Sequence, residues 1–336
     1  MKKLIIAFYA FFLLVPLVGM SQEKAVKVSY AQSATFWGDE FKVVAVTDNE
    51  KLAKKGISKG IKEIKNIEKL ISSSDPKSQV NKINKYAGVK PVKVDDDLYS
   101  LIATCQKISE MTGGAFDITS ASLANLWNFD GAVESLPQQA AIQEALSLIN
   151  YKNIILDENK KTVYLKNKGM KIGFGEIGKG YAAKMGANEM IDKGIEHGLI
   201  NVDGDIYAWG LKEDGTDWEI ALSSPPSDSL NQPTAWFRAN GQAVITVGNY
   251  EKVKEVDDKM YHDRLDPKTG YPTRGIKSVT IVASDAVYAD ALASAVFVLG
   301  VDKGIELINK LEDTHALIVT EDGKMKPSDN LEYWSN

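Results

Sequence analysis

The sequence predicts an α+β fold, in which strands and helices mix without strict alternation. Apolar residues recur at helical spacing in the first half of the chain, whereas short strand-like segments dominate residues 199–283. A doubly wound sheet would instead require a regular alternation of strands and helices. The chain has 336 residues, of which 44% are hydrophobic, enough for one large or two modest domains with a substantial core.

The chain before residue 115 is predicted to hold one strand and two helices. Residues 41–46 predict the strand. Isoleucines on one face predict a helix over 49–71, its lysines form the solvated opposite face, and a breaker cluster at 72–76 ends it. Residues 98–111 predict the second helix, which stops at Thr112-Gly113-Gly114.

The remaining chain is predicted to combine three helices with several short strands, and the strands dominate residues 199–283. Helices are predicted over 138–149, over 179–193 and over 285–299. The predicted strands are 153–156, 162–165, 200–202, 218–222, 243–246 and 278–282. No internal repeat, low-complexity tract or proline-rich linker divides the sequence.

Residues 1–21 are predicted to be a secretory signal peptide. Lys2 and Lys3 form a positive n-region, an apolar run spans residues 4–18, and the small residues Gly19 and Ser21 precede the predicted cut. A membrane span needs about 20 apolar residues, so this run is short for an uncleaved anchor. We therefore expect an exported, periplasmic protein, which would be membrane-associated if the segment stayed uncleaved.

Composition and charge argue against several classes. The formal net charge of −5 argues against nucleic acid as a partner. The only cysteine, Cys105, cannot form an intramolecular disulfide and is predicted to be a small buried apolar residue. His197, His262 and His315 are too widely spaced for a zinc set, and only His262 lies in a polar cluster. The sequence leaves the oligomeric state open.

The stretch Gly173-Phe-Gly-Glu-Ile-Gly-Lys-Gly-Tyr-Ala-Ala183 predicts a phosphate-binding turn that leads into a helix. It matches a dinucleotide fingerprint and most of a Walker A loop, but Gly180 stands where a Walker loop needs a hydroxyl for magnesium. A second strand ending at Asp203 keeps the dinucleotide interpretation open, although no βαβ series precedes the loop. The plain alternative is a strand-to-helix turn that needs glycine only for its backbone.

One acid interrupts the nearly all-apolar helix predicted near the C-terminus. Asp290 and Ser294 are four residues apart and therefore lie on one face of that helix. Burying an unpaired carboxylate costs several kcal/mol, so Asp290 needs a base, a backbone donor or a cation. The two oxygen groups suit Mg²⁺, whereas a cap made by Asp290 and a bond from Ser294 back along its own helix is the alternative.

Several ordered motifs span nearly the whole chain after residue 21. They are Ser78-Gln-Val-Asn-Lys-Ile-Asn84, Thr112-Gly-Gly-Ala-Phe-Asp-Ile-Thr119 with Leu126-Trp127, Gly175-Glu-Ile-Gly-Lys-Gly-Tyr-Ala182, Gly204-Asp-Ile206, Asp266-Pro-Lys-Thr-Gly270 and Asp290-Ala-Leu-Ala-Ser294. Taken together, the motifs resemble the ApbE family, the exported FAD:protein FMN transferases. The resemblance implies that residues 22–336 form one two-lobed domain that holds FAD in a cleft, with Mg²⁺ at the pyrophosphate. It also implies transfer of FMN to a Thr or Ser hydroxyl of a partner protein, with release of AMP.

The same resemblance implies roles for individual residues. Asp290, Ser294 and the backbone carbonyl of Glu176 would hold the cation, and Lys179 with loop N–H groups would help to neutralise the diphosphate. The residues expected to contact FAD are Ala115, Phe116, Asp117, Lys179, Thr246 and Asp266. The residues expected to act in catalysis are Asp290, Lys179 and His262.

A few positions depart from the family pattern. Ser74 stands where an aromatic residue is usual, Trp37-Gly38-Asp39 replaces a Met-Gly-Thr-like triplet, and Val247 replaces a serine. Asp263 stands where a histidine is common, and in an extended segment its neighbour His262 would face the opposite way. Without transfer chemistry the protein would be a FAD pyrophosphatase giving FMN and AMP, or a non-catalytic FAD-binding protein. The expected acceptors are exported flavoproteins of respiratory or extracellular electron transfer.

Overall fold

The computed structural model describes residues 26–127, 129, 136–222, 235–250, 252–257 and 259–335, except for the side chains of residues 124 and 125. Within these ranges, the largest element is an eight-stranded sheet whose neighbouring strands all run antiparallel. In spatial order the strands are β1 (Val28–Phe36), β2 (Asp39–Thr47), β6 (Gly198–Val202), β7 (Asp205–Trp209), β10 (Gln242–Gly248), β13 (Ile276–Ala283), β14 (Thr314–Thr320) and β15 (Met325–Pro327). The pairing of β2 with β6 therefore joins the N-terminal hairpin to the second half of the chain.

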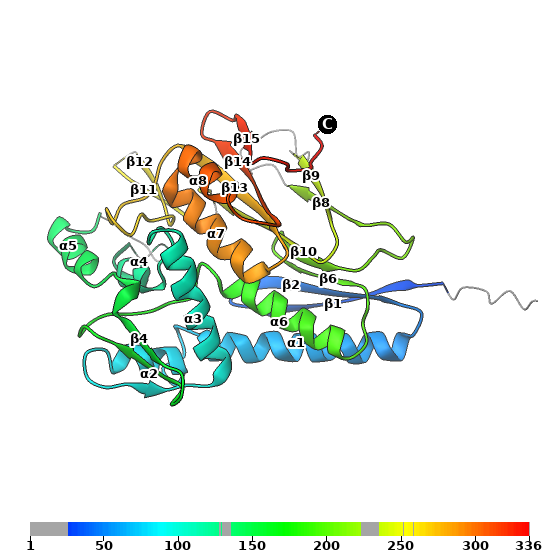
Figure 1. Ribbon diagram of the computed structural model, residues 1–336, viewed down its shortest axis with the longest axis horizontal. Helices are drawn as coiled ribbons and strands as arrows, with labels where there is room; N and C mark the ends of the chain where they lie inside the picture. The colour runs from blue at the N-terminus through cyan, green and yellow to red at the C-terminus, as the bar shows by residue number, and fades with distance from the viewer. Residues whose placement is uncertain are drawn as a thin grey trace, which may run out of the picture.

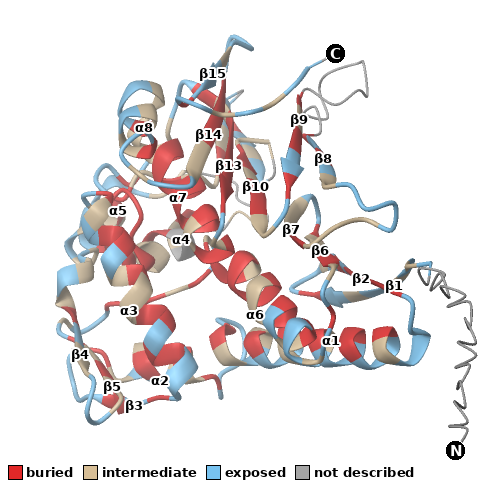
Figure 2. Ribbon diagram, turned by 45° about the vertical axis from the view of Figure 1, so that its right-hand side comes forward, coloured by how far each residue is buried: buried red, intermediate tan, exposed pale blue. Residues whose placement is uncertain are grey.

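Helices cover one face of this sheet (Figure 1). They are α1 (Glu50–Ile71), α6 (Gly178–Asp192), α7 (Ala286–Leu299) and α8 (Val301–Ile308). Helix α1 begins at Asn49, whose side chain accepts a hydrogen bond from the Leu52 N–H at 3.0 Å, and it buries the predicted isoleucine stripe. Helix α7 is almost wholly buried, packed on β10 and β13 and against α6 (Figure 2). The helices that carry the candidate site residues are thus among the most enclosed parts of the fold.

The opposite face of the sheet is partly covered by a β-hairpin. Its strands are β8 (Trp218–Leu222) and β9 (Ala235–Ala239). They pack on Val44, Leu199 and Val244, which point away from the helical layer. A separate hairpin, β11 (Val253–Val256) and β12 (Lys259–His262), lies between β10 and β13 in the sequence and leads into residues 263–266.

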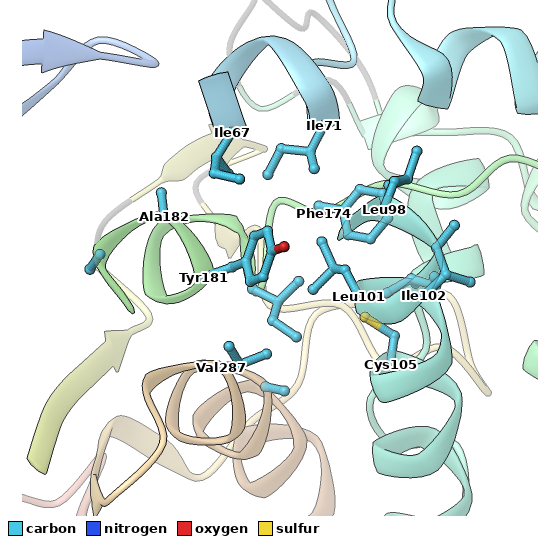
Figure 3. Packing of buried hydrophobic residues seen from close by; sticks show 14 of the residues in the cluster. Ile67, Ile71, Leu98, Leu101, Ile102, Cys105, Phe174, Tyr181, Ala182 and Val287 are labelled. Atoms are coloured by element: carbon cyan, nitrogen blue, oxygen red, sulfur yellow. The ribbon is translucent and has the colours of Figure 1, made fainter. Parts of the chain in front are cut away.

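The remaining elements form a second part at one end of the helical layer (Figure 1). They are α2 (Gln79–Lys85), β3 (Val92–Lys93), α3 (Asp96–Met111), η1 (Ile118–Ser120), α4 (Ala121–Trp127), α5 (Gln139–Ser147), η2 (Tyr151–Asn153), β4 (Ile154–Asp157) and β5 (Thr162–Leu165). Figure 3 shows Leu101 and Cys105 of α3 in one cluster with Ile71 of α1, Tyr181 of α6 and Val287 of α7. One hydrophobic core therefore joins the two parts, and the predicted α+β class is confirmed.

The sequence-based boundaries agree closely with the structure for the long helices, and β5 and β8 have the predicted bounds. Strand β1 was not predicted, although it pairs with β2 over its whole length. The predicted signal peptide, residues 1–21, lies outside the described residues. In the part of the chain that the structure describes, no helix has the length and apolar character needed to cross a membrane.

Candidate active site

The glycine-rich stretch is fixed from two sides before α6 begins. Asn84 of α2 makes two hydrogen bonds with the backbone of Ile172, at 2.8 and 3.0 Å. The Gly173 N–H donates to the carbonyl of Ile118 at 3.0 Å. The chain then turns, and α6 begins at Gly178. The predicted turn into a helix is present, and parts of the chain far away in sequence hold it in place.

A carboxylate from α7 caps the N-terminus of α6. The N-cap residue Ile177 makes no side-chain cap bond, but Asp290 Oδ2 accepts a hydrogen bond from the Gly180 N–H at 3.0 Å. Asp290 is only 7% exposed, and the positive end of the α6 dipole stabilises its charge. A Cβ at Gly180 would lie 2.4 Å from the carbonyl oxygen of Ala286, so glycine is what lets the helices approach this closely. The cap uses one carboxylate oxygen and is compatible with a cation on the same group.

Ser294 lies one helical turn beyond Asp290 and is also buried. Its Oγ has no hydrogen-bond partner, so the bond back along its own helix is not made. Buried polar atoms nearly always have partners, and an unsatisfied hydroxyl near a buried carboxylate fits a hard cation such as Mg²⁺. The described residues contain no group of three or more His, Cys, Asp or Glu side chains arranged for a metal. The expected Mg²⁺ ligands would not form such a group, because only one of them is a carboxylate, and the other two are a hydroxyl and a backbone carbonyl.

Negative charge accumulates around Glu176, the residue whose carbonyl is the third expected ligand. Burial raises the pKa of the Glu176 carboxyl to about 7, and the charge of Arg264 opposes this rise. Asp263, Asp290 and Asp117 each raise the same pKa further through their negative charges. These carboxylates therefore lie close enough to repel one another, and a bound cation would stabilise their charged forms.

Lys179 lies on the first turn of α6, where its Nζ forms an ion pair with Asp39 Oδ2 at 2.7 Å. Asp39 is the first residue of β2 and belongs to the triplet that departs from the family pattern. The two side chains are 35% and 28% exposed, so a ligand can reach the ammonium group. This ion pair could not be predicted from the sequence, because the two residues lie on elements that are distant along the chain.

Residues 115–117 are expected to line the FAD site, but they are buried or hydrogen-bonded within their own turn. The Phe116 side chain is fully buried in the core, and its N–H donates to Thr112 Oγ1 at 3.2 Å. Asp117 accepts hydrogen bonds from the Thr119 N–H and hydroxyl and from the Tyr151 N–H. Burial raises the pKa of the Asp117 carboxyl, and these bonds oppose the rise. Ala115 is also buried, so this segment is held rigidly by packing and backbone hydrogen bonds, and its expected contact with FAD stays a prediction.

Thr246 and Asp266 also have local partners. The Thr246 N–H donates to Asp205 Oδ1 at 2.9 Å, and its hydroxyl lies 2.9 Å from that of Thr280 on β13. Asp266 Oδ1 accepts the Lys268 N–H at 2.8 Å and thereby closes its own proline turn. Both residues are half-buried, so part of each side chain remains accessible to a ligand.

His262 is buried at the end of β12, and both of its ring nitrogens contact backbone groups. Its Nε2–H donates to the Thr273 carbonyl at 3.0 Å, and its Nδ1 accepts the Arg264 N–H at 3.3 Å. Burial lowers the pKa of the imidazole and so favours its neutral form. The structure therefore places His262 as a support for the following segment, and its predicted catalytic role stays a prediction.

Two open hollows lie elsewhere, at the β8–β9 hairpin and the C-terminal segment. Their volumes are about 490 and 560 Å³, and both are lined by Glu219 and Arg238. None of the expected site residues lines either hollow. The residues expected at the site lie instead around Glu176, where the negative charges of Asp290, Asp263 and Asp117 all raise the pKa of its carboxyl group.

The α6 N-terminus, the buried carboxylate and the unsatisfied hydroxyl lie together and have the chemistry that a phosphate-containing ligand with a hard cation would need. Comparison with known proteins then gives the family. The sequence model of the ApbE family matches residues 36–318, which is more than half of the chain. The chain belongs to the ApbE family.

Relatives and solved structures agree with this assignment. A FAD:protein FMN transferase from Klebsiella pneumoniae is 32% identical over 293 residues, 87% of this chain and 89% of that protein. One from Escherichia coli is 28% identical over 263 residues, 76% and 74% of the two chains. The ApbE protein of Thermotoga maritima has a TM-score of 0.82 at 33% identity, covering 90% of this chain and 97% of its own. The flavinyl transferase ApbE of Pseudomonas stutzeri, in its apo form, has a TM-score of 0.80 at 25% identity, covering 90% and 95%.

Proposed function

We propose that this protein transfers the FMN part of FAD to a Thr or Ser hydroxyl of an acceptor protein, releases AMP and requires Mg²⁺. Relatives that align with most of the chain are FAD:protein FMN transferases, which supports the donor and the type of acceptor. The observation that carries the proposal is the junction of α6 and α7. There, a buried carboxylate caps a helix N-terminus and a buried hydroxyl on the next turn has no hydrogen-bond partner.

The expected roles follow from these positions. Asp290, Ser294 and the carbonyl of Glu176 would hold Mg²⁺, which supplies positive charge next to the diphosphate when it is bound. Lys179 adds a second positive charge, and Asp39 holds its ammonium group in place. The first N–H groups of α6 point toward the same region and favour an anion there. Phosphoryl transfer depends mainly on such positioning and charge neutralisation.

The proposed FAD-binding surface consists of Thr246, Asp266 and the turn formed by residues 115–117. Thr246 in β10 and Asp266 in its proline turn are both half-buried, so each residue keeps some surface that a ligand could contact. Ala115, Phe116 and Asp117 contribute a rigid wall, because Phe116 is packed in the core and Asp117 is bonded to backbone. Substitution of these residues would therefore lower FAD affinity together with stability.

We also propose that the protein is exported and modifies periplasmic flavoproteins of respiratory or extracellular electron transfer. The charge pattern and apolar run of residues 1–21 support export. Expression of the full chain with cell fractionation and N-terminal mass analysis tests this assignment. A mature chain that begins near residue 22 in the periplasmic fraction supports it, and an intact N-terminus in the cytoplasm contradicts it.

The transfer reaction is tested by incubating residues 22–336 with FAD, MgCl₂ and a purified acceptor flavoprotein domain. We expect the intact mass of the acceptor to increase by one FMN, with an equal amount of AMP released, and EDTA to abolish both. AMP and free FMN without a labelled acceptor would identify a FAD pyrophosphatase. Bound FAD without AMP would identify a non-catalytic binding protein.

A further inference from the structure

Helix α1 presents a strongly basic face to solvent. Its buried residues lie on the side that contacts α6, β1 and β2, so the opposite side points away from the rest of the protein (Figure 1). The exposed residues recur at helical spacing along this opposite side and form what we call the lysine face. They are Glu50, Lys51, Lys54, Lys55, Ser58, Lys59, Lys62, Lys65, Asn66 and Lys69. A chain with a formal net charge of −5 therefore carries a concentrated positive charge on one helix.

Most of this positive charge is not neutralised by acidic side chains of the protein. Lys54 forms an ion pair with Glu50 at 2.6 Å. In the part of the chain that the structure describes, the other lysines of the lysine face make no ion pair with an acidic side chain. The remaining acids of α1 are half-buried, and they accept hydrogen bonds from the Asn66 side chain and the Trp37 N–H. Lysines one helical turn apart repel one another, and an anionic partner would relieve this repulsion.

The composition of the lysine face favours a lipid surface over a protein partner. The cores of protein interfaces are enriched in aromatic residues, Met and Arg and are depleted in Lys. Helix α1 is described over its whole length, and none of its exposed residues is apolar or an arginine. Its 22 residues span about 33 Å, so the lysines form a straight row that fits a flat anionic surface. Each lysine close to such a surface adds to the attraction without requiring a fixed bonding geometry.

We propose that the lysine face of α1 binds the surface of membranes that contain anionic phospholipids. The binding is peripheral and reversible, because the face has no apolar side chains that could insert among the acyl chains. Strand β1 and helix α1 begin at the same end of the molecule (Figure 1, Figure 2), so an export segment that stayed uncleaved would anchor the chain beside this face. The lysine face is separate from the candidate active site, since none of the expected site residues lies on α1.

The test measures sedimentation of residues 22–336 with lipid vesicles, so that the predicted signal peptide does not contribute. One set of vesicles is pure phosphatidylcholine, and about one third of the lipid in the other set is phosphatidylglycerol. We expect binding only to the anionic vesicles. Raising NaCl from about 0.1 M to about 1 M should abolish it, because the screening length falls from about 10 Å to about 3 Å.

A pair of charge variants locates the binding surface. Lys55→Gln with Lys62→Gln removes two exposed lysines of the lysine face. Each lysine near the surface strengthens binding about five-fold, so this double variant should lower the partition coefficient about 30-fold. The matched control, Lys303→Gln with Lys326→Gln, removes the same charge from exposed positions on α8 and β15, at the opposite edge of the molecule (Figure 1). The control should bind nearly as tightly as the wild type.

Three results would overturn the inference. They are equal binding to both kinds of vesicle, an equal loss of binding in the two double variants, and no binding by the folded wild type. If the wild type ignored vesicles but bound the acceptor domain less tightly after substitution of the lysine face, the partner would be a protein. FMN transfer in solution should be the same in both variants and the wild type, so the outcome with vesicles and the outcome for the proposed function are independent. Thermal unfolding of each variant shows that the measured protein is folded.

Discussion

The close approach of α6 and α7 at Gly180 is the feature on which the candidate site depends most directly, and Gly180→Ala tests it. The added Cβ would lie 2.4 Å from the Ala286 carbonyl oxygen and 2.9 Å from the Asp290 Cβ. Neither neighbour can rotate away, because both belong to the packed helix α7, so the helices must separate by roughly 1 Å to restore normal contact. That separation lengthens the 3.0 Å bond from the Gly180 N–H to Asp290.

The expected energetic effect combines two opposing contributions. Overpacking of this kind costs about 1–3 kcal/mol, and replacing glycine by alanine inside a helix returns up to about 1 kcal/mol. We therefore expect Gly180→Ala to lower the free energy of unfolding by about 1–2 kcal/mol in urea titrations and to lower transfer about 10-fold or more. Gly175→Ala is the matched control, because its added Cβ would meet no atom within 4 Å. Equal or greater stability of Gly180→Ala, with Mg²⁺-dependent FAD binding intact, would refute the close-approach reasoning.

Further predictions concern Ser294, Glu176 and His262. Ser294→Ala should stabilise the metal-free protein by about 1 kcal/mol, because it removes an unsatisfied buried hydroxyl, and should weaken Mg²⁺ binding in calorimetric titrations; destabilisation would contradict the ligand role. The pKa of Glu176 is raised from 4.5 to about 7, so the folded protein binds more protons than the unfolded chain between these pH values, and its metal-free stability should fall as pH rises through that window. Urea titrations at several pH values should show this fall in the wild type and not in Glu176→Gln. His262→Ala should lower the free energy of unfolding by about 1–3 kcal/mol, because it leaves the Thr273 carbonyl and the Arg264 N–H without their partner. A large loss of kcat at unchanged stability would instead support the predicted catalytic role of His262.

The long helices could be predicted because local patterns determine them. Helix α1 has a cap at Asn49 and one buried isoleucine stripe, and both signals are contained in its own sequence. Strand β1 carries a weaker signal, because most residues of Val28–Phe36 are exposed and the alternation of apolar and polar residues is interrupted at Ala31 and Gln32. It forms through its pairing with β2, which a search for buried faces does not reveal.

Only those parts of the candidate site that lie within one helix or strand could be predicted from the sequence. Helical spacing placed Asp290 and Ser294 on one face of one helix, and both are buried there. The bond from Gly180 to Asp290 and the ion pair of Lys179 with Asp39 join distant segments, so no local pattern contains them. Alternation along an extended segment did predict that two neighbouring residues, 262 and 263, face opposite ways. In the folded chain His262 is buried, whereas the side chain of Asp263 is 21% exposed.

The most direct test of the account is the Mg²⁺ dependence of FMN transfer by the wild type and by Asp290→Asn. Asparagine keeps the size of the side chain and an oxygen for the Gly180 N–H, so the variant retains the cap but loses the charge. We predict that the wild type labels the acceptor with FMN and releases AMP in proportion to bound Mg²⁺. Folded Asp290→Asn should show neither reaction and no saturable Mg²⁺ binding. Mg²⁺-dependent transfer by Asp290→Asn at the wild-type rate would contradict the assignment of the α6–α7 junction as the metal and phosphoryl-transfer site.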